Sequence, residues 1–364
     1  MKVSLSKYQA CLLGGAIGDA LGAPIEFLSI GQIRALSGPD GLNHYIEFSD
    51  GTGAFTDDTQ MTLFTAEALL RAYHKECIKG IPDAMNTIAH HSYLRWYHTQ
   101  THPYTETITN KAGILNGWLV RQQGLYRNRA PGNTCLSALR SGKAGTIEKP
   151  INDSKGCGTV MRMAPVGLMY FGQNEEAFRI ACELSAITHG HPTGYLSAGF
   201  FASVISDLAV GITLELAIHN AIRILEDQEH HHETLAAVQK ALLLFRKTKA
   251  GNSPPTPETY EKLGEGWVAE EALAMALFAA LSYPDDFREG VLLALNHSGD
   301  CDSTASITGN LLGLMNGVKS IPATWIDNLR ERRLVNQMAV DLFLRVKGGF
   351  KEEDPEWSEK YPPG

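Results

Sequence analysis

The chain has 364 residues, of which 44% are hydrophobic and 20% are charged, and its formal net charge is −8. This composition argues against a disordered or fibrous protein. The absence of long Lys and Arg runs argues against general binding to a nucleic-acid backbone. Six cysteines are scattered without a CxxC pair, which is typical of reduced thiols in a cytoplasmic protein and disfavours a secreted disulfide framework.

The first predicted element is a helix in MKVSLSKYQACLLGGAIGDALG, where Lys2 and Asp19 interrupt a semi-apolar stretch. A signal peptide needs an uninterrupted apolar core. The other apolar stretches, such as Ala272 to Leu281, are too short or too charged for a membrane span.

In the first predicted helix, apolar residues repeat on one helical face. That face consists of Tyr8, Cys11, Leu12, Ala16, Ala20 and Leu21.

Thr56, Asp57 and Asp58 directly precede a second amphipathic helix. Thr and Asp are common N-caps, and acids favour the positive end of a helix. Capping accounts for only one of the two adjacent carboxylates. The two carboxylates repel each other, and a hard cation bound between them would remove this repulsion. The apolar face of this helix consists of Met61, Phe64, Ala68, Leu69 and Ala72.

The middle of the chain contains a glycine-rich loop in SKGCGTVMRMAPVGL, with Gly156 and Gly158 before Met161 and Arg162. Bare backbone of this kind can present N–H groups to a phosphate. The loop is neither a Walker loop nor a dinucleotide fingerprint, and Arg162 could equally be a buried structural residue.

Two histidine groups follow. His189 and His191 lie two apart, without the further Cys or His that a zinc site needs. The run His230 to His232 follows acidic residues and is interpreted as a solvated surface.

Turn-forming residues separate the predicted helices at 37–41, 130–133 and 251–257, and the last of these is the strongest break. It could divide two domains, but we favour an excursion inside one domain because the informative motifs lie on both sides of it. A third helical face follows, and alternating β-branched runs are nearly absent. We therefore predict a single all-α domain over residues 1–350 and a charged, Pro-containing tail over 351–364, poorly ordered from Glu352 onward. The third face consists of Ala269, Leu273, Ala276, Leu277 and Ala280.

A second acidic cluster, Asp300 and Asp302 around Cys301, is followed by Ser303 and Thr304 at the start of another helical pattern. Acids two apart can converge on one cation, although the remainder of a calcium-binding loop is missing. Cys301 is not expected to be a ligand, because Mg²⁺ and Mn²⁺ prefer oxygen. If both acidic clusters met in space, they would form a shell for two hard divalent ions.

Two stripes of glycine have a spacing of four residues. Glycine inside a helix costs about 1 kcal/mol against alanine, so the stripes predict two helices that pass close to each other or to a ligand. Gly22 and Gly317 could equally just end their helices. The stripes consist of Gly14, Gly18 and Gly22, and of Gly309, Gly313 and Gly317.

These motifs together resemble the ADP-ribosylglycohydrolase family. The resemblance runs from GGAIGDALGAPIEF through RAPGNTCLSAL, the Met161–Arg162 loop, SAITHGHPTG and GEGWVAEEALAMAL to GDCDSTASITGNLLG, about four-fifths of the chain. It implies a compact multi-helix domain with a central metal-binding cleft that holds two Mg²⁺ ions, or Mn²⁺.

The resemblance also implies roles for individual residues. The metal ligands would be Thr56, Asp57, Asp58, Asp300, Asp302 and Ser303, where Ser303 replaces a common Thr. The catalytic residues would be Asp57, Asp58, Asp302 and Glu26, an acid that in some members lies at the cleft mouth and gates it. The substrate-binding residues would be Gly156, Cys157, Gly158, Thr159, Met161, Arg162 and His189. Lys155, Cys157 and Thr159 depart from the usual Asn-Gly version of the loop.

The implied activity is metal-dependent hydrolysis of ADP-ribose from modified protein side chains. Two metals would hold the vicinal hydroxyls of the distal ribose and activate a water, while charge develops on the ribose as the bond breaks. N-linked arginine is the favoured linkage, and serine-linked or acetylated ADP-ribose is the alternative within the family. No single general base is assigned.

Other functions remain open. Relatives of this family neutralise ADP-ribosylating toxins by reversing the modification or by binding the toxin, and Met1 to Lys7 or residues 247–261 could provide such a contact. A catalytically inactive descendant, as among lens crystallins, is disfavoured because all four carboxylates are present. A generic metal phosphohydrolase would be expected to carry more histidine ligands.

Overall fold

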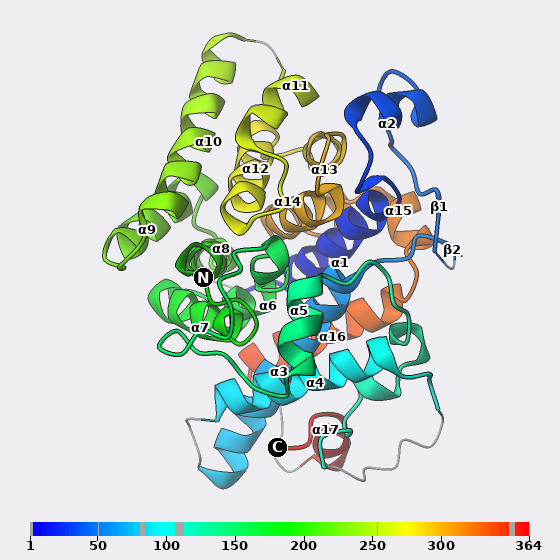
Figure 1. Cartoon of the computed structure of the whole chain (residues 1–364), viewed down its shortest axis with the longest axis vertical. Helices are drawn as coiled ribbons and strands as arrows, with labels where there is room; N and C mark the ends of the chain where they lie inside the picture. Colours follow the sequence, from blue (N-terminus) through cyan, green and yellow to red (C-terminus); the bar gives the residue numbers. More distant parts are fainter. Residues whose placement is uncertain are drawn as a thin grey trace.

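The fold is described from a computed structural model, which covers residues 3–49, 51–80, 84–105, 113–252, 254–348 and 354–363. Across these ranges the chain forms seventeen α-helices, six 3-10 helices and one hairpin of two short strands (Figure 1). The prediction of an all-helical domain is confirmed. The hairpin pairs β1, Glu47–Phe48, with β2, Gly51–Thr52, in antiparallel register.

The helices have the following bounds. They are α1 (Leu5–Gly22), α2 (Ile30–Ser37), α3 (Asp57–Lys79), α4 (Met85–Thr101), α5 (Asn133–Arg140), α6 (Ala164–Met169), α7 (Asn174–Ala186), α8 (Pro192–Ala209), α9 (Leu214–Glu226), α10 (His232–Ala250), α11 (Pro257–Tyr260), α12 (Ala269–Ser282), α13 (Phe287–Leu295), α14 (Cys301–Asn316), α15 (Ala323–Asn328), α16 (Arg332–Val346) and α17 (Pro355–Lys360). The 3-10 helices are η1 (Ala23–Ile25), η2 (Leu119–Arg121), η3 (Gln123–Leu125), η4 (Cys157–Thr159), η5 (Glu261–Leu263) and η6 (Val318–Ser320).

Helices α1, α8, α12 and α14 lie in the interior and are buried along most of their length. Other helices surround them, so these four carry apolar and small residues on all sides rather than on one stripe. One hydrophobic core includes Val238 of α10 and Leu273 of α12. Residues on both sides of the 251–257 loop therefore belong to the same domain.

The two glycine stripes lie on α1 and α14, which pack side by side in the middle of the molecule (Figure 1). A Cβ atom at Gly18 would lie 2.1 Å from the carbonyl oxygen of Ala305, and one at Gly309 would lie 2.1 Å from that of Gly14. The prediction of close helix packing is confirmed. Gly317 instead ends α14, with a φ of +79° that favours glycine.

The C-terminal segment differs from the expectation of poor order. Residues 354–363 contain α17, and Tyr361 is fully buried. The Tyr361 hydroxyl donates to Asp341 Oδ2 at 2.5 Å, and His74 Nδ1 lies 2.6 Å from the Tyr361 carbonyl oxygen. Composition alone misled the prediction, because one buried aromatic residue with satisfied polar groups fixes the segment. Residues 351–353 and 364 lie outside the described ranges.

In the described part of the chain, no single helix is both long and apolar enough to cross a membrane. The pair formed by Leu5–Ile25 and Ile30–Ser37 passes that test by length and composition only, with a bend of 94° between its halves.

Candidate metal centre and active site

The candidate site lies where the N-termini of α3 and α14 meet the end of η1. Thr56 caps α3, and its Oγ1 accepts a hydrogen bond from the Asp58 amide at 3.4 Å. Asp300 caps α14 by accepting from the Ser303 amide at 3.3 Å. Both acidic clusters therefore sit at positive helix ends, as their sequence context predicted.

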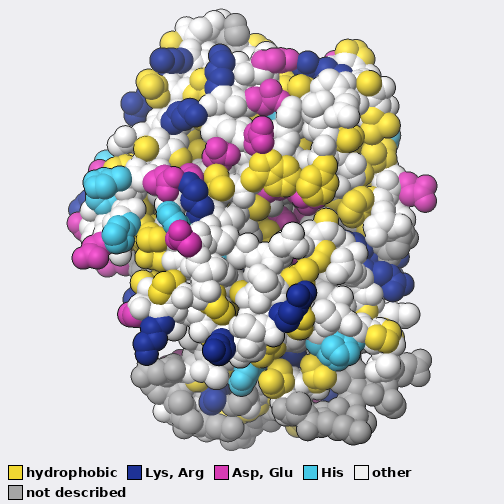
Figure 2. Space-filling view, in the orientation of Figure 1, with side chains coloured by type: hydrophobic (Ala, Val, Ile, Leu, Met, Phe, Trp, Pro, Cys, Tyr) yellow, Lys and Arg dark blue, Asp and Glu magenta, His cyan; other side chains and the backbone are white. Residues whose placement is uncertain are grey.

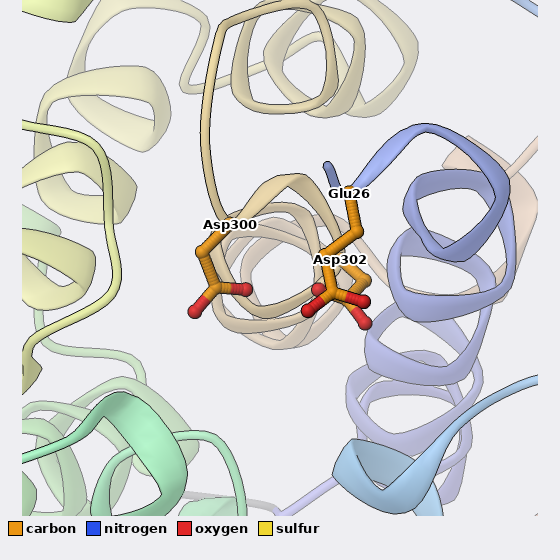
Figure 3. Close-up of side chains that lie close together, drawn as sticks. All are labelled: Glu26, Asp300 and Asp302. Carbon is orange, nitrogen blue, oxygen red and sulfur yellow. The ribbon is translucent and has the colours of Figure 1, made fainter. Parts of the chain in front are cut away.

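Three carboxylates form the centre of the site. Glu26, Asp300 and Asp302 each offer an oxygen within 4.8 Å of the other two, and all three residues are buried. In Figure 3, Glu26 descends from the end of η1 toward Asp302, and the Asp300 carboxylate lies beside them at the start of α14. The acid predicted at the cleft mouth is thus close enough to share a cation with the second cluster.

The first acidic cluster lines the same cavity, which has a volume of about 210 Å³. Thr56 Oγ1 lies 3.4 Å from Asp302 Oδ2, which links the two clusters directly. The Asp57 carboxylate accepts from the Gly132 amide at 3.1 Å. The structure therefore brings together acids that are more than 200 residues apart in the sequence.

Asp19, in the middle of buried α1, is a site residue that the sequence analysis did not single out. Its Oδ1 accepts from the Thr56 amide at 2.8 Å and from the Thr56 hydroxyl at 2.9 Å. Its Oδ2 accepts from the Thr59 amide at 2.9 Å and the Thr59 hydroxyl at 2.5 Å. Asp19 thus holds the first turn of α3 in place. An acid within a glycine-rich buried helix was the available signal.

Burial and mutual repulsion raise the pKa values of these carboxyl groups. Burial, followed by the charges of Asp302, Asp300, Asp57 and Asp19, raises the pKa of Glu26 to about 10. Burial and Asp302 raise the pKa of Asp19 to about 7. The pKa values of Asp57, Asp58 and Asp300 are raised well above the usual range, chiefly by burial.

The chemistry of the donor set fits a hard divalent cation. Among the described residues, none of the six carboxylates forms an ion pair with Lys, Arg or His. Asp58 Oδ1 and Glu26 Oε2 are buried without a hydrogen-bond partner. Buried carboxylate oxygens without partners are strongly unfavourable, and a cation that prefers oxygen ligands would satisfy them.

The glycine-rich loop forms another wall of the cavity. Its backbone pairs with the segment before α12, through a hydrogen bond from the Cys157 amide to the Trp267 carbonyl at 3.1 Å. Lys155 is tied to Glu233 and Glu270. The His189 ring packs against the loop, since a Cβ at Gly158 would lie 3.2 Å from its Cε1. Gly156, Cys157, Gly158, Met161 and His189 all line the cavity.

Arg162 and Thr159 are fully buried and lie behind this wall rather than in it. The Arg162 guanidinium donates to Thr188 Oγ1 at 2.8 Å and stacks over Tyr93 at 4.6 Å. Thr188 Oγ1 in turn lies 2.8 Å from His189 Nδ1. Burial, followed by the charge of Arg162, lowers the pKa of His189 to about 3, so Arg162 supports a neutral histidine in the cavity wall.

Cys157 and Ser303 connect the loop with the second acidic cluster. The Cys157 thiol donates to Asp300 Oδ2 at 2.7 Å, and the Ser303 hydroxyl lies 3.6 Å from the Cys157 sulfur. One of the loop residues that depart from the usual Asn-Gly version is therefore in direct contact with a candidate metal ligand.

Two aromatic residues at the mouth were not predicted. Trp267 lines the cavity and stacks on Phe27, with ring centroids 5.5 Å apart. Phe27 is 74% exposed. Figure 2 shows a hollow in the middle of this face, bordered by apolar side chains. Single aromatic residues in loops carry no periodic signal, so the sequence did not distinguish them.

Comparison with known proteins supports the family resemblance over nearly the whole chain. The profile of the family described as ADP-ribosylglycohydrolase matches residues 2–351. The ADP-ribosylarginine hydrolase Tri1 of Serratia proteamaculans is 25% identical, over 93% of this chain and 80% of its own length. The ADP-ribosyl-[dinitrogen reductase] glycohydrolase of Rhodospirillum rubrum is 23% identical, over 92% of this chain and 95% of its own length.

A similar fold occurs in a solved structure titled ADP-ribosylglycohydrolase-related protein complex. The TM-score is 0.64 at 22% identity, and the similarity covers 95% of this chain and 100% of the other.

Proposed function

The chain belongs to the ADP-ribosylglycohydrolase family, and from that premise we propose that it is a hydrolase that removes ADP-ribose from modified arginine side chains with two bound Mg²⁺ ions, or Mn²⁺. Relatives whose names specify ADP-ribosylarginine and ADP-ribosylated dinitrogen reductase support de-ADP-ribosylation of proteins. The arginine linkage is proposed because a relative over most of this chain is named an ADP-ribosylarginine hydrolase.

One observation carries the proposal: buried carboxylates from three parts of the chain surround one cavity, and no cationic side chain in the described part of the chain is paired with them. A binding protein without catalysis has no need for such a cluster, because buried uncompensated acids destabilise the fold. Asp57, Asp58, Asp300 and Asp302, with the Thr56 and Ser303 hydroxyls, would hold the two metal ions. Glu26 is close enough to Asp302 to serve as a further ligand or as a gate.

The metal centre would supply Lewis acidity and a water of lowered pKa near neutral pH. The protein's own groups account for the remaining requirements. Asp19 fixes Thr56 and Thr59, so the ligands of α3 are held in place before substrate arrives. Gly156 and Gly158 leave room beside His189 for a diphosphate to approach the backbone. Neutral His189 adds a polar group without adding charge.

The principal test measures free ADP-ribose released from an arginine-ADP-ribosylated protein, with Mg²⁺ and with chelator. We expect release with Mg²⁺ and a loss of about 10³-fold or more in the Asp302→Asn variant, as for removal of an essential group. The folded state of that variant is checked by circular dichroism.

Equal release in the presence of chelator would overturn the metal mechanism. Release from serine-linked or acetylated ADP-ribose, but not from arginine, would overturn the linkage. No release from any of them would favour a protein that neutralises an ADP-ribosylating toxin by binding, which stays a prediction.

A further inference from the structure

A second and larger hollow lies beside the candidate active site. It has a volume of about 920 Å³ and is formed by α7, α8, the turn between α9 and α10, and residues 147–153. Phe178, Cys182, Tyr195 and Leu196 form its buried apolar floor, and Ile147 at its edge is 38% exposed. We name this hollow the acidic groove. The cavity of the candidate active site, which Asp57, Asp300 and Asp302 line, is called the metal cavity below. None of the residues of the acidic groove lines it.

A thin partition of polypeptide separates the acidic groove from the metal cavity. Asn152 Nδ2 donates to the Thr188 carbonyl at 2.8 Å, and the Gly190 amide donates to Asn152 Oδ1 at 3.1 Å. Asn152 and Gly190 line the groove, whereas the adjacent His189 lines the cavity. A polypeptide seated in the groove would therefore lie within a few residues of a side chain that enters the cavity.

The edge of the acidic groove carries uncompensated negative charge. Asp153, Glu175, Asp227 and Glu229 are exposed, and none of the four forms an ion pair with another described residue. Among the described residues that line the groove, Arg179 is the one Arg or Lys, and it is already paired with Glu176 and Glu183. Figure 2 shows acidic and histidine side chains beside apolar ones at the left edge of the molecule, near the turn between α9 and α10.

We propose that the acidic groove binds the segment of the target protein that flanks the modified residue, and that this segment carries Lys or Arg beside apolar side chains. The inference rests on the proposed function and specifies its target class. The metal cavity has room for part of an ADP-ribosyl group but not for a polypeptide. An apolar floor with a negative edge complements a basic, partly apolar peptide, and such charges act on both association rate and selectivity.

The experiment compares two substrates in two variants of the full-length protein. The substrates are ADP-ribosyl-agmatine, which lacks a polypeptide, and an ADP-ribosylated arginine peptide with flanking Lys, Arg and Leu. One variant reverses the groove charges by Asp227→Lys and Glu229→Lys. The matched control, Asp285→Lys with Glu47→Lys, makes the same change in net charge at exposed acids outside the groove.

We expect the groove variant to raise KM for the basic peptide about tenfold at low salt, with kcat unchanged. KM for ADP-ribosyl-agmatine should stay within about twofold, and the control variant should resemble the wild type for both substrates. The difference should shrink above about 0.5 M salt, because the charges are exposed and therefore screened.

Equal KM values of the groove and control variants for the basic peptide would overturn the inference. So would an equal loss for both substrates, which would indicate a disturbed active site. Light scattering that showed a wild-type dimer, dissociated in the groove variant, would assign the groove to a second copy of the chain.

If wild-type protein hydrolyses neither substrate, the proposed function fails, and the groove is then tested by fluorescence anisotropy with the unmodified basic peptide. Tighter binding by the wild type than by the groove variant would support the groove on its own, and no binding would overturn it.

Discussion

Asp58 shows how a single side chain can reveal a ligand site. The residue is 3% exposed, and its Oδ1 has no hydrogen-bond partner. Burial and then Asp302 raise its pKa well above the usual range. A group in this position opposes folding when it is charged. The same features make it a strong ligand once a cation is present, so stability and binding respond oppositely to its removal.

Replacing Asp58 with Asn is therefore expected to weaken Mg²⁺ binding at least about tenfold while stabilising the metal-free protein by about 1–2 kcal/mol at pH 8. Isothermal titration calorimetry measures the first effect and urea unfolding with chelator the second. The exposed Asp285→Asn variant is the control and should change neither quantity. Lower stability of the metal-free Asp58→Asn protein would contradict this account.

Part of the site was visible at the residue scale in the sequence. Two adjacent acids before a helix start, Asp57 and Asp58, are more than a cap requires, which directed attention to them. Trp267 and the orientation of Arg162 were not predictable, because neither follows from local periodicity. Arg162 is directed away from the cavity by contacts with Tyr93 of α4 and with Thr188 in the turn after α7, neither of which is a sequence neighbour.

Helices α1 and α14 are the elements on which the site depends. Gly18 lies against Ala305, and Gly22 lies against the backbone of Asp302 itself, 2.4 Å from the position of an added Cβ. The first acidic cluster is held by Asp19 of α1, and the second begins α14. The contact between these helices therefore sets the separation between the two acidic clusters.

We expect Gly18→Ala to lower the free energy of unfolding by about 1–3 kcal/mol, because its methyl group would overlap backbone atoms that cannot rotate away. Mg²⁺ affinity should fall with it, since α14 must shift. Gly31→Ala is the control, because exposed Gly31 on α2 meets only Ser29 Oγ at 3.9 Å. It should be neutral or stabilise by up to about 1 kcal/mol. Unchanged stability of Gly18→Ala would mean that the helices are not tightly packed there.

The elements were also the most predictable level of the structure. Glycine spacing of four on two segments predicted the α1–α14 contact, because glycines aligned on one face of a helix let another backbone approach closely. The short helix α17 was missed, since its composition is charged and rich in proline. Its order depends on long-range contacts of Tyr361 that no local pattern encodes.

At the scale of the whole molecule, the acidic centre links folding to pH and, under the proposed function, to metal. The folded protein keeps protons on Asp19, with a pKa of about 7, and on Glu26, with a pKa of about 10. The unfolded chain loses these protons near pH 4. The folded state therefore binds more protons between these values, and its stability must fall as the pH rises.

We expect the melting temperature of the chelator-treated protein to decline steadily as the pH rises from about 4 toward about 9. The free energy of unfolding falls by at most about 1.4 kcal/mol per pH unit for each group. Saturating Mg²⁺ should reduce or reverse this decline, because the metal binds the deprotonated carboxylates. Differential scanning calorimetry with Mg²⁺ and with chelator measures both curves. A metal-free protein that becomes more stable toward pH 9 would contradict the clustered arrangement.

The crossing of α1 and α14 has a further consequence for biosynthesis. The partner of α1 lies nearly 280 residues downstream of it, so a ribosome that adds 5–20 residues per second needs roughly 14–56 s to supply that partner. During that time α1 lacks its main packing partner, although α3 and α6, which also contact it, are already synthesised, and the nascent chain has no complete acidic centre. The two acidic clusters therefore come together among the last events of folding, and early release or stalled translation leaves a polypeptide that exposes part of its first helix to aggregation.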